Sequence, residues 1–140
     1  MSNPLIRVAT AVDLAEIARI QQASPQASQW PPPDYLAYSS LVAEIDGKIT
    51  GFLASRETAP DEREILNLAV DPPFRRRGIA RSLLAYELHC YPGVKWFLEV
   101  RASNDDALKL YESLDFKRVG VRDNYYRDPP ESAIVMRLFS

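Results

Sequence analysis

One short segment, Arg75-Arg76-Arg77-Gly78-Ile79-Ala80, has the composition of an anion-binding loop. It follows a predicted strand and leads into a predicted helix, whose first backbone N–H groups have no partner within the helix. These N–H groups and the helix dipole favour a negatively charged ligand, the arginines add positive potential, and Gly78 lets the ligand approach the backbone. The segment therefore predicts a diphosphate site. Taken alone, it is equally compatible with a solvated basic turn that needs glycine only for its geometry.

Two common phosphate-binding motifs do not match this segment. A Walker loop ends in Gly-Lys followed by Ser or Thr, and a dinucleotide-binding fingerprint carries several glycines. Gly78 is the only glycine of the segment. The pattern thus argues against a nucleoside triphosphate or NAD as the bound molecule.

Cysteine and histidine chemistry is nearly absent from the chain. Cys90 is the only cysteine and His89 the only histidine, and they are adjacent near the end of a predicted helix. Solvated or packing roles are expected there, since disulfides, Cys/His zinc sites and Ser-His or Cys-His pairs would need other partners or another placement. The remaining candidates for chemistry are carboxylates, tyrosines, backbone amides and a borrowed cofactor, and no metal is required.

The elements around the basic loop predict an α/β (α+β) fold. Thr10 and Asp13 resemble a capping box before a first helix, Asp46-Gly47 suits a tight hairpin turn, and Asn104 can cap a late helix. Residues 24–33 form a long connection, because their prolines disfavour helix. We expect strands near residues 5–8, 41–45, 48–55, 65–70, 96–100, 117–122 and 133–138, a polar loop at 59–63, and helices after Thr10, near 34–38, over 82–88 and after Asn104.

Composition predicts one globular domain over residues 1–140. The chain is 46% hydrophobic and 26% charged, so it is neither disordered nor fibrous. A net charge of -2 provides no basic field for nucleic acid or an anionic membrane. No apolar run approaches the ~20 residues of a membrane span, and residues 1–7 lack a signal-peptide core. We therefore expect a cytoplasmic protein without nucleic-acid or membrane partners, and the oligomeric state is left open.

Several motifs resemble those of the GNAT superfamily of N-acetyltransferases. Arg75-x-x-Gly78-x-Ala80 after Leu66-Asn67-Leu68-Ala69-Val70-Asp71-Pro72 is similar to the acetyl-CoA signature of that superfamily. Three later motifs resemble the RimI-like ribosomal-protein alanine N-acetyltransferases, and they keep the order of that branch. These motifs are Leu98-Glu99-Val100-Arg101-Ala102-Ser103-Asn104, Leu110-Tyr111-Glu112-Ser113-Leu114-x-Phe116 and Asn124-Tyr125-Tyr126. The resemblance runs from about Ile65 to the end of the chain.

The resemblance implies a GNAT fold with a mixed, mostly antiparallel sheet of about seven strands and about four helices. The strands at 65–70 and 96–100 would separate at their ends to admit acetyl-CoA.

The resemblance also implies which residues bind the coenzyme. They are Leu68, Ala69 and Val70 through their backbone, Arg75, Arg76, Arg77, Gly78, Ile79, Ala80 and Arg81 at the diphosphate, and Asn104 and Tyr111. Glu99 would be the general base, and Tyr111 would serve the departing sulfur. Segments 29–38 and 124–127 would line the acceptor groove, with Trp30, Tyr125 and Tyr126 as substrate-binding candidates.

Physical chemistry leaves other interpretations open for these residues. Glu99 shares a strand face with Phe97, which indicates a poorly solvated carboxylate suited to accept a proton, but an exposed glutamate at a strand end is the alternative. Tyr111 has the spacing of a packed core tyrosine, and this is compatible with a hydroxyl near the sulfur. Trp30, Tyr125 and Tyr126 can equally be surface packing.

The implied activity is direct acetyl transfer from acetyl-CoA to a protein N-terminal α-amine, with the N-terminal alanine of a ribosomal protein as the acceptor. A lysine side chain or a small-molecule amine is an alternative acceptor, and a non-catalytic acyl-CoA-binding module is an alternative class. An α-amine of pKa ~8 is far more often neutral at pH 7 than a lysine of pKa ~10.4. The single carboxylate Glu99 therefore suits the α-amine better.

Overall fold

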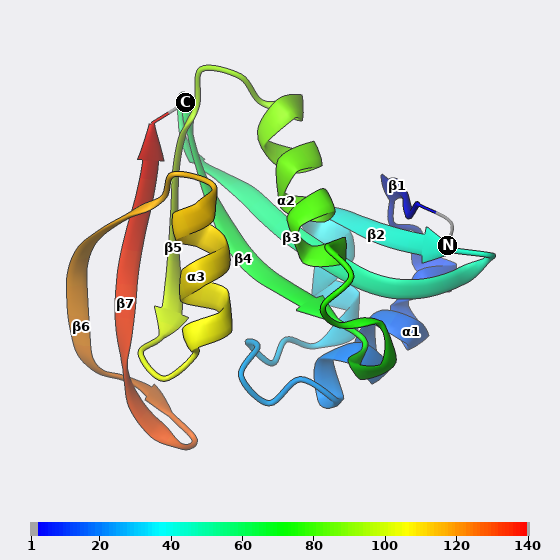
Figure 1. Cartoon of the computed structure of the whole chain (residues 1–140), viewed down its shortest axis with the longest axis horizontal. Helices are drawn as coiled ribbons and strands as arrows, with labels where there is room; N and C mark the ends of the chain where they lie inside the picture. Colours follow the sequence, from blue (N-terminus) through cyan, green and yellow to red (C-terminus); the bar gives the residue numbers. More distant parts are fainter. Residues whose placement is uncertain (1–2, 140) are drawn as a thin grey trace. The chain divides into compact units, whose positions relative to one another are not determined.

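The computed structural model describes residues 3–139 of the chain (Figure 1). Its strands are β1 (Leu5–Val8), β2 (Ser39–Ile45), β3 (Lys48–Ala59), β4 (Glu62–Val70), β5 (Lys95–Arg101), β6 (Lys117–Arg127) and β7 (Pro130–Phe139). Its α-helices are α1 (Leu14–Gln22), α2 (Ile79–Cys90) and α3 (Asp105–Ser113), and its short 3₁₀ helices are η1 (Ala11–Asp13), η2 (Pro32–Ala37) and η3 (Pro72–Phe74). Within residues 3–139, no helix is both long and apolar enough to cross a membrane.

The strands form one sheet in the order β1-β2-β3-β4-β5-β7-β6. β4 runs parallel to β5, with Glu62–Ile65 beside Lys95–Leu98. The β1–β2, β2–β3, β5–β7 and β6–β7 pairs are antiparallel. The predicted α/β fold with a mixed, mostly antiparallel seven-stranded sheet is therefore confirmed. The separation of the strand ends at 65–70 and 96–100 stays a prediction.

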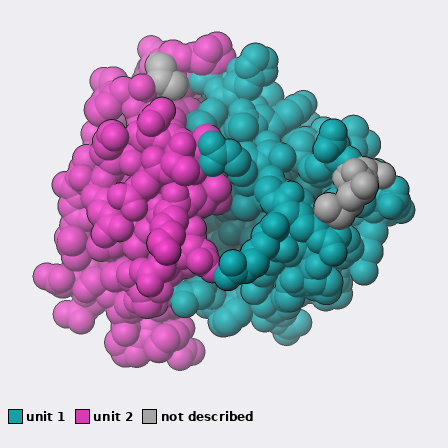
Figure 2. Space-filling view, in the orientation of Figure 1, with its two compact units in different colours: residues 1–56, 66–91 teal, residues 57–65, 92–140 magenta. Residues whose placement is uncertain are grey.

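The chain divides into two compact units, coloured separately in Figure 2. Unit 1 comprises residues 1–56 and 66–91, and unit 2 comprises residues 57–65 and 92–140. The division falls within β3 and β4. The single domain expected over residues 1–140 stays a prediction.

The core of unit 1 is built from α1, η2 and the strands β2 and β3. Ile17 and Ile20 of α1 are buried together with Tyr35 of η2 and Phe52 of β3. The spacing of Ile17 and Ile20 places both on one face of the helix. The Tyr35 ring meets the Phe52 ring edge to face, with 5.3 Å between centroids. This packing fixes η2 against the sheet.

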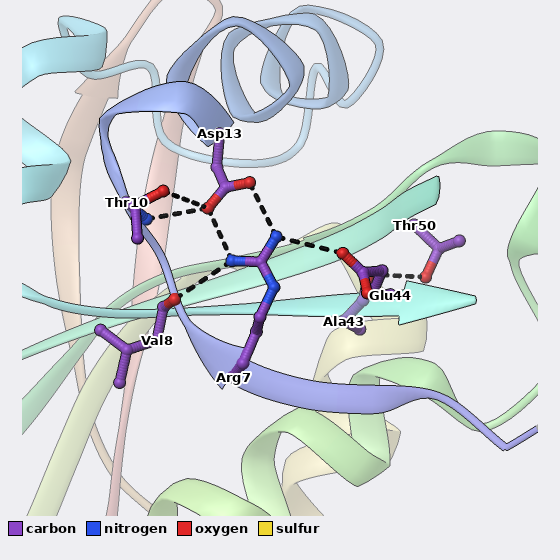
Figure 3. A network of polar contacts seen from close by, with 7 residues as sticks. All are labelled: Arg7, Val8, Thr10, Asp13, Ala43, Glu44 and Thr50. Carbon is purple, nitrogen blue, oxygen red and sulfur yellow. Dashed lines mark hydrogen bonds and ion pairs between the residues drawn. The ribbon is translucent and has the colours of Figure 1, made fainter. Parts of the chain in front are cut away.

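Arg7 ties the first strand to the start of the first helix (Figure 3). Its guanidinium donates to both carboxylate oxygens of Asp13 at 2.8 and 2.9 Å and to Glu44 Oε1 at 3.1 Å. Asp13 also accepts the backbone N–H of Thr10 at 2.8 Å, so the predicted capping box is confirmed. The hydrogen bonds from Arg7 lower the pKa of the buried Asp13 carboxyl. The network therefore joins β1, η1 and β2.

Unit 2 combines α3 with β5 and the long β6–β7 hairpin at the left of Figure 1. Asn104 caps α3 by accepting the backbone N–H of Ala107 at 3.2 Å, as predicted. Trp96 and Leu98 of β5 are buried with Met136 of β7. The unit thus has an apolar centre of its own.

Two segments expected to lie outside strands fall partly or wholly within strands. Residues 59–63 were expected to form a polar loop, but Ala59 ends β3 and β4 begins at Glu62. Asp61 adopts a left-handed φ of 58°, which permits a tight turn without further residues. Residues 124–127 belong to β6, where the pairing with β7 shifts register between Arg122 and Tyr126. The positive φ of Asn124, 54°, allows the strand to continue through this irregularity.

Candidate active site

The basic loop of unit 1 ends in a helix start that lacks a side-chain cap. Gly78 is the residue that caps α2, with a left-handed φ of 77°. A Cβ added at Gly78 would meet no atom within 4 Å, so the glycine is required for its backbone conformation and the space above it is open. Arg75, Arg76 and Arg77 are exposed. The loop can therefore receive an anion at the N-terminus of α2.

The arginines of this loop differ in their contacts. Arg75 donates from Nε to the carbonyl of Val70 at 3.0 Å and from its guanidinium to Ser24 Oγ at 3.1 Å. Arg77 lies over the ring of Phe74, 5.3 Å from its centroid. Arg75 therefore anchors the loop to the end of β4 and to the segment after α1. Its side chain was expected to face a diphosphate, and the structure gives it this anchoring position.

The backbone of Leu68, Ala69 and Val70 lies at the end of β4, directly before the basic loop. The N–H of Leu68 is donated to Asn67 Oδ1 at 3.1 Å, and the carbonyl of Val70 accepts Arg75. Neighbouring side chains thus fix this stretch of backbone. The predicted pairing with the pantetheine arm stays a prediction.

Glu99 is the outstanding polar residue of unit 2. Its side chain is only 10% exposed, and its nearest basic group, Arg122, places Nε 3.8 Å from Oε1. Among the described residues, Oε2 is buried and has no hydrogen-bond partner. A buried carboxylate oxygen without a partner is unfavourable by itself and can accept a hydrogen bond from a ligand. The prediction that Glu99 is poorly solvated agrees with this burial.

Tyr125 and Tyr126 of unit 2 lie close to this carboxylate, and Tyr111 lies close to Tyr126. The rings of Tyr125 and Tyr126 meet edge to face, with centroids 5.1 Å apart. Burial raises the pKa of Tyr125, and a hydrogen bond with Glu99 and the charge of Glu99 raise it further. Burial raises the pKa of Tyr126 to about 12. Burial also raises the pKa of Tyr111 well above its usual value, and Tyr126 adds a smaller effect.

The structure therefore brings Glu99 together with Tyr125 and Tyr126, and it brings Tyr126 together with Tyr111. Asn104, the predicted coenzyme ligand of the same unit, uses its Oδ1 in the α3 cap, so its Nδ2 is the part of the amide that remains for a ligand. The roles assigned to these residues by resemblance stay predictions.

Arg101 has a position that the sequence did not indicate. Its guanidinium lies 4.3 Å from the centroid of the Tyr126 ring and donates to the carbonyls of Pro129 at 2.9 Å and Asp128 at 3.2 Å. It also pairs with Glu131 at 3.3 Å. Arg101 is buried and holds the end of the β6–β7 hairpin beside Tyr126. The sequence feature that could have pointed to this position is an arginine two residues after Glu99, on the same face of a largely buried strand.

Trp30 lies in unit 1, in the segment expected to line the acceptor groove. Its ring packs against the core of that unit and meets Tyr38 edge to face at 6.0 Å. Its Nε1 is buried and lacks a partner among the described residues. Trp30 therefore has a packing role, and its part in substrate binding stays a prediction.

Comparison with known proteins places this arrangement among acetyltransferases. Residues 12–116 match the model of the acetyltransferase (GNAT) family. The chain is 43% identical over 106 residues to a [ribosomal protein bS18]-alanine N-acetyltransferase of Escherichia coli (strain K12), covering 72% of this chain and 71% of the relative. It is 46% identical over 98 residues to the N-alpha-acetyltransferase RimI of Mycobacterium tuberculosis, covering 68% and 62%. The crystal structure of the ribosomal-protein-S18-alanine N-acetyltransferase from Escherichia coli superposes with a TM-score of 0.84 and 33% identity, covering 97% and 93%.

Proposed function

Because the chain belongs to the GNAT family of acetyltransferases, we propose that it transfers the acetyl group of acetyl-CoA to the N-terminal α-amine of a protein. The observation that carries the proposal is the buried, unpartnered Oε2 of Glu99 within a cluster of tyrosines. A carboxylate in that state can take a proton from an incoming amine. The acceptor we infer is the N-terminal alanine of a ribosomal protein, because the Escherichia coli relative is named for acetylation of an alanine of ribosomal protein bS18. Such an acceptor places the reaction in the cytoplasm.

The residues of unit 1 fit the coenzyme as a substrate. The uncapped N-terminus of α2, the open space over Gly78 and the exposed Arg76 and Arg77 suit a diphosphate. Bound there, acetyl-CoA supplies the activated acetyl group. The backbone N–H groups at the end of β4 would orient that group and polarise its carbonyl.

In unit 2, Glu99 acts on the acceptor. It takes a proton from the ammonium form, and the neutral amine nitrogen then forms a bond to the acetyl carbon while the carbon–sulfur bond breaks. The electron pair of that bond leaves on sulfur near the Tyr111 hydroxyl, and the nitrogen releases its extra proton, which protonates the thiolate so that the products are the amide and coenzyme A. Tyr125 and Tyr126 flank Glu99 and would contact the first residue of the acceptor. A protein N-terminus is accessible in this way because its amine ends the chain.

The α-amine is favoured over lysine by its proton affinity. At pH 7 about a tenth of an α-amine of pKa ~8 is neutral, but only about one lysine in 2,500 is neutral, a difference of roughly 3 kcal/mol. Oε2 of Glu99 is the single buried carboxylate oxygen without a hydrogen-bond partner in the part of unit 2 that the structure describes. One such base is sufficient to deprotonate an α-amine, which loses its proton more easily than a lysine side chain does.

The test is acetylation of matched peptides, followed by fragment mass analysis to locate the acetyl group. We expect peptides that begin with alanine to be acetylated at the terminus. The same peptides with a blocked terminus and an internal lysine should react far more slowly. Equal reaction of the blocked peptide would replace the α-amine assignment with that of a lysine acetyltransferase.

A further inference from the structure

A buried polar network in unit 1 connects β4 with η2 and with the loop before it. The Nδ2 of Asn67 donates to the Tyr35 hydroxyl at 2.8 Å and to the carbonyl of Ser28 at 2.8 Å. The Tyr35 hydroxyl donates in turn to Oε1 of Gln21. These three side chains are 5%, 0% and 6% exposed, so the network is shielded from water. Buried polar groups of this kind are stabilising only when all of them are satisfied.

The same network holds the irregular loop between α1 and η2. Gln21 donates from Nε2 to the carbonyl of Trp30 at 2.9 Å, and Gln29 donates to the carbonyls of Gln21 and Ala27 at 3.1 Å each. Side-chain amides therefore fix the course of this loop, where α1 and η2 leave a break in regular structure. The loop and η2 together carry residues 29–38, the expected wall of the acceptor groove.

The two ends of the Asn67 side-chain amide contact different segments of unit 1. While its Nδ2 serves Tyr35 and Ser28, its Oδ1 accepts the N–H of Leu68 at 3.1 Å. Exchanging the two ends of the amide would set a donor against the Leu68 N–H and an acceptor against the Ser28 carbonyl, so the network fixes this orientation. One side chain thus contacts both the acceptor wall and the backbone expected to meet the acetyl-bearing arm.

We propose that Asn67 is a positioning residue that couples the acceptor wall, residues 29–38, to the backbone N–H of Leu68. This inference rests on the proposed function. Asn67 is buried and acts through Tyr35, Ser28 and Leu68. When the wall shifts, the Asn67 amide shifts with it, and the Leu68 N–H changes its direction. Correct seating of the acceptor is thereby linked to the course of the β4 backbone that is expected to meet the acetyl-bearing arm.

The first test separates the two arms of Asn67 by steady-state kinetics. Tyr35→Phe removes the hydroxyl and leaves the Leu68 contact, so the KM for an alanine-initiated peptide should rise about fivefold, with kcat and acetyl-CoA affinity little changed. Asn67→Ala removes both arms and should also lower kcat about tenfold. The matched control is Thr50→Val, which removes a buried hydrogen bond of 3.1 Å to the carbonyl of Ala43, apart from the network. It should leave both kinetic constants unchanged.

The double variant Tyr35→Phe/Asn67→Ala provides a sharper measurement. If the residues act as one unit, its KM and kcat should match those of Asn67→Ala alone. Hydrogen exchange gives a second readout that needs no acceptor: Asn67→Ala should speed exchange at Leu68 and at residues 27–31 together, and Thr50→Val should not. Independent effects in the double variant, or kinetic constants equal to those of Thr50→Val, would overturn the proposal. Failure of the wild-type protein to acetylate any peptide terminus would instead overturn the proposed function, while the exchange measurement still tests the coupling.

Discussion

Two polar side chains with little exposure, Asn67 in unit 1 and Glu99 in unit 2, differ in how their polar atoms are satisfied. In unit 1, Asn67 uses both ends of its amide, and Tyr35 bonds on both sides of its hydroxyl. In unit 2, Glu99 is similarly buried, yet its Oε2 has no partner among the described residues. Leaving such a group unpaired costs about 1–3 kcal/mol, more for a charge.

We propose that this difference distinguishes side chains that hold the chain in one geometry from a side chain that acts on a bound ligand. A satisfied network stabilises one arrangement of the chain, so changing it should alter stability or geometry. An unsatisfied carboxylate oxygen adds no hydrogen bond to the free protein, and we propose that Oε2 of Glu99 serves a ligand instead. Substitutions that remove a partner from a satisfied group, or that remove the unpaired oxygen of Glu99, test this difference directly.

The largest effect is expected for Glu99→Gln, which keeps the shape of the side chain and removes the proton acceptor. Turnover should fall by roughly 10² or more near neutral pH, equivalent to at least about 2.7 kcal/mol, with acetyl-CoA binding retained. Activity should recover partly as pH rises, because more of the amine is neutral. These values come from kcat measured across pH and from calorimetric titration with acetyl-CoA.

For the same Glu99→Gln variant we expect a change in the free energy of unfolding that is unusual for a substitution of a largely buried residue. Because an amide replaces a carboxylate with an unpaired oxygen, the free energy of unfolding should be unchanged or higher. Wild-type turnover over the whole pH range would exclude Glu99 as the base. A clear loss of stability would show that Oε2 is satisfied in solution.

The next largest effect is expected for Arg7→Ala in unit 1. This substitution leaves a carboxylate oxygen of Asp13 buried without its partner, as Oε2 of Glu99 is in unit 2. Asp13 would remain buried and lose its guanidinium, which should lower the free energy of unfolding by about 2 kcal/mol at pH 7. The folded-state pKa of Asp13 is lowered, chiefly by its hydrogen bonds from Arg7. This stabilisation is therefore complete above the unfolded pKa of about 3.9 and disappears as pH falls through the lowered value. The difference between wild type and variant, measured by urea unfolding, should shrink in acid.

The control for Arg7→Ala is an exposed ion pair of unit 2. Arg118 and Glu112 lie 3.2 Å apart with side chains 51% and 45% exposed. Arg118→Ala should change the free energy of unfolding by less than about 0.5 kcal/mol. Equal losses in the two variants would mean that burial of Asp13 does not set the effect. Kinetic constants should stay at wild-type values in both.

Local signals in the sequence predicted much of this fold. Asp46-Gly47 forms the expected hairpin turn, with φ of 50° and 80°, and Asn104 caps α3. Such features depend on neighbours a few residues apart, so the residue types alone reveal them. The same holds for the basic loop, whose helix start is set by Gly78.

Contacts between distant residues were not predictable in this way. Asn67 bonds Tyr35 and Ser28, which precede it by 32 and 39 residues, and no periodic pattern marks those partners. The expected strand near 117–122 was too short, because the register shift between Arg122 and Tyr126 and the left-handed Asn124 that let β6 continue to Arg127 depend on its pairing with β7. The resemblance named Glu99 and Tyr111, but their burial and the stacking of Arg101 on Tyr126 required the packed chain.

The smallest effect is expected for Tyr111→Phe, which tests how far the buried tyrosines of unit 2 take part in the reaction. The ring packs edge to face on Phe116 at 5.6 Å, and phenylalanine preserves that contact, so stability should change by less than about 1 kcal/mol. Burial raises the pKa of the Tyr111 hydroxyl, which therefore holds its proton more tightly than a thiol of pKa ~8.5 does. The hydroxyl should accordingly stabilise the departing sulfur by a hydrogen bond and keep its proton. On this basis kcat should fall about tenfold, roughly 1.4 kcal/mol, by the same factor at every pH from about 6 to 9. The measurement is kcat in water and in deuterium oxide for both proteins. A loss of a thousandfold, together with a solvent isotope effect present only in the wild type, would instead identify Tyr111 as the donor of a full proton.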